Sequence, residues 1–387
     1  MPSHLPSLMQ MLQQLIATPS VSSVSPEYDQ SNRPVIERLA EWAETLGFAV
    51  EVVDIPGHPD KANLIATLGR GPGGLVLAGH TDTVPFDADL WSQDPFRLTE
   101  RDRRLYGLGT ADMKGFFALA LEAVRSIDAG ALHQPLILLA TADEESSMLG
   151  AKTLVDLGRP KARYALVGEP TGLRPVNAHK GIMMEAVRLI GHSGHSSDPS
   201  LGINALEGMH AVLGAILAWR GELQARHRDP RFHVPVPTLN LGHIHGGDNP
   251  NRICGACELH FDLRPLPGMG STELREALRE RLTETLAGSP LQWELHPLIE
   301  ATEPMHTDAD SAIVRAAEAL TGHPAEAAAY CTEGPYLNAL GMETIILGPG
   351  YIDQAHQPDE YLPLENMQPM LDHLAHLIDR FCLQPAG

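Results

Sequence analysis

Histidine and carboxylate side chains follow several apolar runs in this sequence, where they could bind divalent cations. The run Gly74–Pro85, GLVLAGHTDTVP, predicts a short buried strand that ends at His80 and Asp82. Because side chains alternate along a strand, these two should project from the same face, and an imidazole beside a carboxylate can hold or orient a metal ion. A lone H-x-D is more often a surface histidine beside a turn, so the interpretation depends on the rest of the chain.

Further motifs place acids or histidine beside other predicted elements. They are Asp112 in GTADMKG, Glu144 and Glu145 in ADEESS, Glu169 in GEPTG and His356 in QAHQPDEY. Asp112 precedes a predicted helix, where its ordinary role would be the N-cap. The glutamates follow the buried strands predicted over Pro135–Ala140 and Tyr164–Val167. Three strands in succession that deliver acids or histidine indicate a site at the carboxyl edge of a sheet.

The donor set predicts a particular metal chemistry. Two imidazoles and three carboxylates suit Zn²⁺, with Co²⁺ or Mn²⁺ as substitutes. Five ligands are too many for one catalytic zinc, so two ions with Asp112 as the bridging carboxylate are expected. Such a pair can lower the pKa of a shared water and polarise a carbonyl. Glu144 would then be the general base, and Asp82 would fix the ring of His80 by a hydrogen bond.

Composition excludes several classes of function. The chain has 387 residues, 43% of them hydrophobic, and a formal net charge of −21. This length allows two domains with sizeable cores, and the negative charge argues against nucleic acid or an anionic membrane as partner. We expect no signal peptide and no membrane-spanning segment, and four cysteines do not make a disulfide framework. A cytoplasmic protein with reduced thiols is expected.

The order of predicted elements indicates an α/β domain that a second domain interrupts. Strands alternate with helices over residues 1–179 and again over 298–387, which we assign to a discontinuous catalytic domain. Residues 180–297 instead follow the order β-α-β-β-α-β, the ferredoxin-like pattern of an inserted α+β domain.

Longer motifs carry a family resemblance. GHTDTVP, GTADMKG, ADEESS, GEPTG and QAHQPDEY resemble the successive motifs of the dinuclear zinc aminoacylase/carboxypeptidase clan. NLGHIHGGDNPNRICGACELHFDLRPLPGM, YCTEGP and LGPGYIDQAHQPDEYL are similar to its bacterial members that act on N2-acetyl-L-ornithine. The resemblance covers essentially the whole chain. It implies metal-dependent hydrolysis of that substrate to L-ornithine and acetate, a step of arginine synthesis.

The resemblance also assigns roles to residues. It implies that one metal ion takes His80, Asp112 and Glu169, while the other takes Asp112, Glu145 and His356. Glu144 would be the base, and the peptide bond after Asp112 would be cis. The inserted domain would act as a lid and dimerisation domain of a homodimer. His195 would reach the site of the partner subunit, where we expect a hydrogen bond to the developing oxyanion.

The free carboxylate of the substrate needs a cationic partner. Arg264 and Arg252 are the candidates, with Asn251 and Thr332 as helpers. For each arginine alone, a structural ion pair is an equal alternative. Glu333 could receive the ornithine ammonium, although an ordinary surface acid is the better interpretation of that residue.

Two alternative functions stay open at this point. Acetylcitrulline, or another N-acyl amino acid or dipeptide, would be a related substrate that differs in side-chain charge. A catalytically inert metal-binding or carrier protein belongs to a different class. Such a protein should have lost its base or a ligand, whereas here all of them are present.

Overall fold

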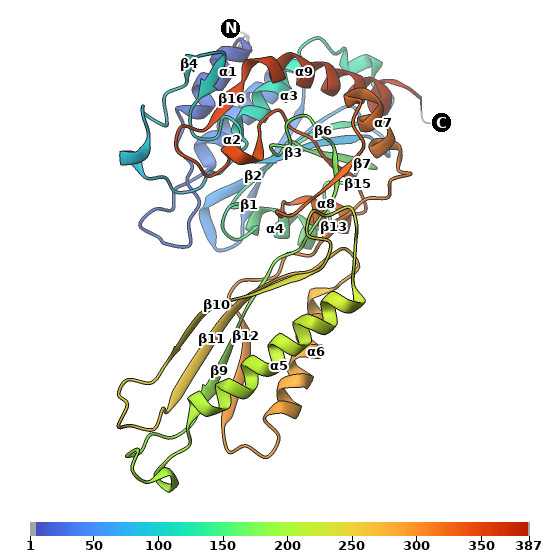
Figure 1. Ribbon diagram of the computed structural model, residues 1–387. Coiled ribbons are helices and arrows are strands. Elements are labelled where there is room, and N and C mark those ends of the chain that lie inside the picture. Colours follow the sequence, from blue (N-terminus) through green and yellow to red (C-terminus); the bar gives the residue numbers. More distant parts are fainter. Residues whose placement is uncertain (1–4, 386–387) are drawn as a thin grey trace. The chain divides into compact units, whose positions relative to one another are not determined.

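The computed structural model describes residues 5–385, which form two compact units (Figure 1). We call the first the α/β unit: it contains the chain up to Asn177, the segment His306–Glu326 and the chain from Thr332 onward. The second, the insert unit, contains Ala178–Met305 and Ala327–Cys331.

The α/β unit contains a mixed sheet with helices packed against it. Its helices are α1 (Leu8–Ile16), α2 (Arg33–Thr45), α3 (Lys114–Val124), α4 (Leu149–Leu157), α7 (Ala312–Thr321), α8 (Gly334–Ala339) and α9 (Leu364–Ile378). The main strands are β1 (Ala49–Ile55), β2 (His58–Leu68), β3 (Leu75–His80), β6 (Leu136–Thr141), β7 (Tyr164–Val167) and β15 (Glu343–Ile346). A small sheet is made by β4 (Thr99–Arg101), β5 (Arg104–Tyr106) and β16 (Tyr361–Pro363). Three further strands, β8 (Val176–His179), β13 (Met305–His306) and β14 (Glu326–Ala328), span the boundary between the units.

The strand order brings the predicted motifs to one edge. The large sheet runs β1-β2-β6-β3-β7-β15-β8-β13, and β3 is parallel to both β6 and β7. The carboxyl ends of these three strands therefore lie together, which places the segments after His80, Thr141 and Val167 side by side. The mixed α/β class predicted from the sequence is confirmed.

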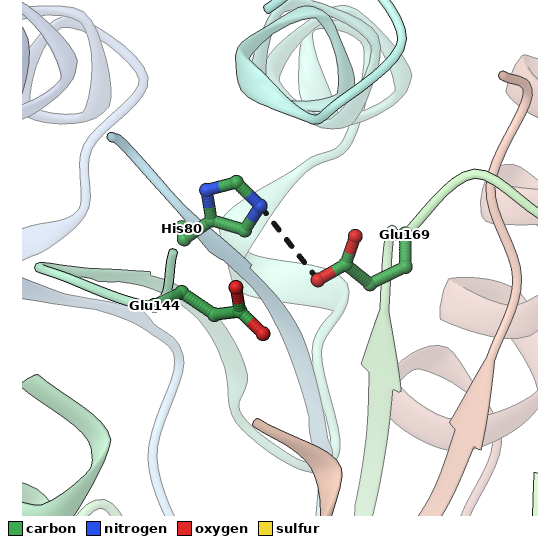
Figure 2. A group of neighbouring side chains, drawn as sticks. All are labelled: His80, Glu144 and Glu169. Atoms are coloured by element: carbon green, nitrogen blue, oxygen red, sulfur yellow. Dashed lines mark ion pairs between the residues drawn. The ribbon is translucent and has the colours of Figure 1, made fainter. Parts of the chain in front are cut away.

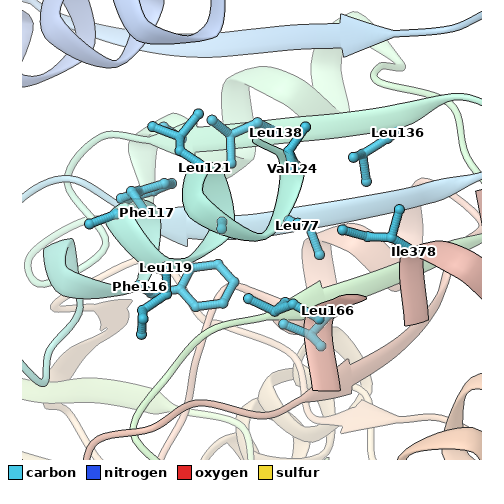
Figure 3. Close-up of a cluster of buried hydrophobic side chains, with 14 of the residues drawn as sticks. Leu77, Phe116, Phe117, Leu119, Leu121, Val124, Leu136, Leu138, Leu166 and Ile378 are labelled. Atoms are coloured by element: carbon cyan, nitrogen blue, oxygen red, sulfur yellow. The ribbon is translucent and has the colours of Figure 1, made fainter. Parts of the chain in front are cut away.

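The core of the α/β unit explains why α3 is apolar on all sides. This helix packs against β3, α1 and α9, so nine of its eleven residues are buried. Figure 3 shows its aromatic rings, Phe116 and Phe117, in one cluster with strand residues such as Leu77, Leu138 and Leu166. Full burial of a side chain of this size contributes roughly 1.5–3 kcal/mol. The packing therefore holds α3, and the loop that precedes it, firmly against the sheet.

The insert unit has the predicted β-α-β-β-α-β order. Its elements are β9 (Met183–Ile190), α5 (Ala205–Arg226), β10 (Thr238–Gly246), β11 (Ala256–Arg264), α6 (Ser271–Thr285) and β12 (Gln292–Pro297). The sheet order is β10-β11-β9-β12, and neighbouring strands pair antiparallel. Alternate residues of β11, from Cys257 to Leu263, are buried in the core shared with α5 and α6, which is typical of a sheet with one covered face.

Membrane-spanning helices and disulfide bonds are both absent from the part of the chain that the structure describes. Among residues 5–385, no helix combines the length and the apolar character that crossing a membrane requires. None of the cysteines in this range forms a disulfide bond.

Candidate metal centre

His80 ends β3 with its ring already oriented. The side chain is 1% exposed, and its Nδ1 lies 3.0 Å from the carbonyl oxygen of Asp82. If Nδ1 donates to that carbonyl, Nε2 carries the free lone pair. Nε2 lies 3.1 Å from Asp112 Oδ1 and 3.7 Å from Glu169 Oε1. Figure 2 shows His80 and Glu169 facing one another, with the carboxylate of Glu144 pointing toward the space beside them.

The carboxylate of Asp82 does not make the hydrogen bond that we predicted from the sequence. It lies 3.8 Å from His80 Nδ1, and its oxygens instead accept the N–H groups of Glu144 at 3.3 Å and Glu145 at 3.0 Å. The prediction assumed strand alternation through Asp82, but β3 ends at His80, so alternation no longer determines where the next side chains point. The Asp82 backbone holds the imidazole, while its side chain holds both glutamates.

Asp112 lies between two histidines. Its Oδ1 faces His80, and its Oδ2 lies 3.4 Å from Nε2 of His356. The same Nε2 is 3.2 Å and 3.0 Å from the two carboxylate oxygens of Glu145. Asp112 precedes α3 by two residues, and the peptide bond that follows it is cis, as the resemblance implies. The two faces of one carboxylate thus point to two separate sets of donors.

The electrostatics of the centre favour bound cations. Burial raises the pKa values of Glu144 and Glu169 well above the ordinary value, and neighbouring carboxylates add to this effect. Hydrogen bonds with Asp112 and Glu145 raise the pKa of His356 to about 10. Without metal, these side chains therefore keep bound protons, and divalent cations would displace those protons on binding.

The donor atoms also lie close enough together for metal binding. Two groups have ligand atoms within 4.8 Å of one another: His80 with Asp112 and Glu145, and His80 with Glu144 and Glu169. Imidazole and carboxylate donors at this spacing suit Zn²⁺ and similar ions. The residues present therefore fit a metal centre.

Buried polar contacts support the loop that carries Glu144 and Glu145. The preceding residue, Asp143, has a φ of 57°, a left-handed backbone conformation that residues other than glycine rarely adopt. Its Oδ1 lies 2.7 Å from Nζ of Lys61 and 2.8 Å from Oγ of Ser22. Lys61 is 2% exposed and also contacts Asp29 at 2.7 Å. A charged pair thus fixes the turn from which both glutamates project.

Glu333 is not the surface acid that we expected. It is 1% exposed, and its Oε2 accepts the hydroxyl of Thr141 at 2.6 Å, while its buried Oε1 has no hydrogen-bond partner. Burial raises its pKa to about 7. The residue is the N-cap of the short helix α8, which packs against α4 and β15, and this packing removes it from solvent. Thr332, also buried, accepts the N–H of Gly334 at 3.0 Å.

Four other predicted residues belong to the insert unit. His195 and Arg252 form a backbone bridge, and the carbonyl of Asn251 accepts the N–H of Ser196, so the structure brings these three together. Arg252 pairs with Asp248 at 2.5 Å.

Arg264 lies elsewhere in the insert unit, at the end of β11. Its Nε is 2.9 Å from Asp262 Oδ2. Both arginines therefore form ion pairs within this unit, which is the alternative that the sequence left open for each of them.

Comparison with known proteins identifies the family. Residues 76–380 match the family described as Peptidase family M20/M25/M40. The chain belongs to this family. An acetylornithine deacetylase of Pasteurella multocida (strain Pm70) is 50% identical over 381 residues, which are 98% of this chain and 99% of the relative. Another, from Pectobacterium carotovorum subsp. carotovorum (strain PC1), is 50% identical over 385 residues, with 99% and 100% covered.

Solved structures of other proteins share the fold. The aminopeptidase PepT of Bacillus cereus superposes with a TM-score of 0.74 at 20% sequence identity, covering 98% of this chain and 99% of that one. A dinuclear metal-binding peptidase of the M20 family from Bacillus subtilis has a TM-score of 0.67 at 15% identity, with 96% of each chain covered. At such identities these likenesses concern the fold alone.

Our sequence reasoning gave no role to three residues that support the centre of this M20 chain. Lys61, Asp143 and Glu360 are all buried and charged by type. Burial and the nearby Asp112 raise the pKa of Glu360 to about 8, while three backbone N–H donors act in the opposite direction. Two of them had a signal in the sequence. Lys61 lies beside the apolar run of β2, and Glu360 belongs to the motif QAHQPDEY that contains His356.

Proposed function

We propose that this chain hydrolyses N2-acetyl-L-ornithine to L-ornithine and acetate, a step of arginine biosynthesis. The observation that carries the proposal is the 50% identity, over almost the whole of both chains, to acetylornithine deacetylases. The cluster of two imidazoles and several carboxylates supports it, because amide hydrolysis needs an activated water and a polarised carbonyl.

Two Zn²⁺ ions, replaceable by Co²⁺, are the proposed cofactors. His80, Asp112 and Glu169 would hold one ion, and Asp112, Glu145 and His356 the other. When bound, such ions supply Lewis acidity and lower the pKa of a nearby water. Asp112 is suited to both sets because its two oxygens face different histidines.

Glu144 is the proposed general base. Its carboxylate reaches the same space as His80 and Glu169, and its N–H is held by Asp82. It would take a proton from the attacking water and return it to the leaving amine of ornithine, because one carboxylate can serve both half-reactions. The raised pKa that burial gives Glu144 favours this return of the proton.

The insert unit is proposed to complete the site as a lid and dimerisation domain of a cytoplasmic homodimer. His195 would donate a hydrogen bond to the developing oxyanion of the partner subunit's substrate. Arg252 or Arg264 would bind the free carboxylate, with Asn251 and Thr332 as helpers. Glu333, whose Oε1 lacks a partner, remains the candidate for the ornithine ammonium.

A substrate panel combined with metal analysis tests the proposal. Wild type and Glu144→Ala would be assayed with acetylornithine, acetylcitrulline and succinyl-diaminopimelate, and their metal content determined. We expect preference for acetylornithine, about two metal ions in both proteins, and a roughly 10²- to 10⁴-fold loss of kcat in the variant. A preference for acetylcitrulline would reassign the substrate, and two bound metals without any hydrolysis would indicate an inert metal-binding protein.

A further inference from the structure

Glu360 is a buried carboxylate whose contacts join two segments that carry candidate metal ligands. It follows His356 by four residues and is 1% exposed. Its Oε1 accepts the N–H of Ala111 at 2.7 Å and of Asp112 at 3.0 Å, and its Oε2 accepts the N–H of Gly109 at 3.0 Å. All three partners are donors, so both oxygens act as acceptors. One side chain therefore satisfies three buried amides of the segment that ends at Asp112.

Main-chain contacts continue this connection. The carbonyl of Glu360 accepts the N–H of Gly107 at 3.1 Å, and in the next position β16 pairs with β5 through Tyr361 and Tyr106. The opposite end of the His356 loop is also tied down, because Asn366 donates to the carbonyl of Pro349 at 2.8 Å. The loop is thus anchored on both sides of His356.

His356 itself has little local support. Its side chain is 56% exposed, its φ is 59°, and the contacts of its ring are with Asp112 and Glu145. The distance between His356 and Asp112 therefore depends on how the two loops are held together. The side chain of Glu360 joins them through three hydrogen bonds, in addition to the main-chain contacts.

We propose that Glu360 is a positioning residue of the metal centre, which keeps the loop of His356 in register with the backbone of Asp112. The proposal rests on the two-metal site proposed above. It predicts an asymmetry between the two sites. Loss of Glu360 would disturb both Asp112 and His356 in one ligand set, but only Asp112 in the other. In that second set, His80 is oriented by the Asp82 carbonyl and Glu169 follows β7.

Metal titration of the whole 387-residue chain tests this asymmetry. After removal of metal by a chelator, Zn²⁺ or Co²⁺ would be titrated into wild type, Glu360→Leu and Glu360→Gln by calorimetry. His356→Ala and His80→Ala identify which binding step belongs to which set. In Glu360→Leu we expect the step that His356→Ala removes to weaken about 10- to 100-fold, the usual effect of losing a group that orients a ligand. The other step should change much less.

The milder variant keeps the test informative if Glu360→Leu folds poorly. In Glu360→Gln the amide oxygen can still accept from Ala111 and Asp112, while the contact with Gly109 is lost. We expect a smaller loss of roughly 2- to 10-fold at the same step. Excess metal should restore much of the turnover in this variant.

Glu365→Leu is the matched control, since Glu365 is an exposed glutamate five residues further on, at the start of α9. It should bind both ions as wild type does. The proposal is wrong if Glu360→Leu and Glu360→Gln bind both ions like wild type, if both steps weaken equally, or if Glu365→Leu shows the same loss. Failure of the wild-type protein to bind two ions would instead overturn the two-metal site itself.

Discussion

The strand ends of the α/β unit and the turn of the insert unit that carries His195 hold their polar side chains in opposite ways. His80 and Glu169 at the strand ends, and Asp112 before α3, are each at most 7% exposed, and their contacts come from distant parts of the chain. In the insert unit, His195 is exposed and contacts Ser197, two positions away.

This difference separates two kinds of functional residue. The buried groups are positioned by folding itself, before any ligand arrives. The backbone of the exposed turn pairs with Arg252, whereas the hydrogen bond of the His195 ring is with the neighbouring Ser197. Substitutions near the strand ends should therefore alter stability or metal binding. Substitutions in the turn should alter turnover alone.

The largest expected effect is on stability and concerns Lys61. Lys61→Met would leave the buried carboxylate of Asp143 without its cation, which costs about 3–5 kcal/mol for a buried pair. Unfolding by urea measures the loss. The exposed pair of Arg159 and Glu51 is the control, and Arg159→Met should cost at most about 1 kcal/mol. Equal losses in the two variants would remove the distinction between buried and exposed charges.

The next effect concerns turnover in the exposed turn. His195→Ala should lower kcat about 10²- to 10³-fold, the usual effect of removing one donor to an oxyanion. Metal content and Tm should stay at wild-type values, since the side chain is exposed. Unchanged turnover would show that His195 has no part in the reaction.

A smaller effect is expected at Asp82, whose carboxylate accepts the N–H groups of Glu144 and Glu145. Asp82→Asn keeps one acceptor oxygen, but its amide nitrogen would face the N–H of Glu144 or Glu145. We expect a roughly 10- to 100-fold loss in metal affinity and turnover. Calorimetric titration and steady-state assays measure these quantities. Asp89→Asn, at an exposed position nearby, should leave both unchanged.

The last effect, which is small for each pH unit, is a pH dependence from Glu333. Because burial raises its pKa from 4.5 to about 7, the folded protein keeps this proton over a range in which the unfolded chain has lost it. The unfolding free energy should therefore fall as pH rises through that window, by up to about 1.4 kcal/mol per pH unit. Denaturation of the metal-free protein at pH 5 and pH 8 tests this. Glu333→Gln should lack this part of the slope, and identical slopes in the two proteins would contradict a buried carboxyl group with a raised pKa.

Local patterns predicted the elements well where one physical signal dominated. The apolar runs before His80 and Thr141 became β3 and β6, and the helical periodicity after Asp112 became α3. Short strands such as β5 and β16 were not predicted, because three residues carry no measurable periodicity. Glu333 was misjudged for a related reason: nothing within a few residues of it shows that α8 packs against α4 and β15.

The sequence by itself determined the chemistry available: which residues can bind a cation, and that parallel strands bring them to one edge of a sheet. Only the tertiary structure decided how those residues are held. The Asp82 carboxylate supports Glu144 and Glu145 rather than His80, Lys61 pairs with Asp143, and Glu360 binds the Asp112 segment. Each of these contacts joins residues at least 62 positions apart. Hydrophobic periodicity reports only on neighbours within a turn or a strand, so contacts at such separations become visible only once the chain has folded.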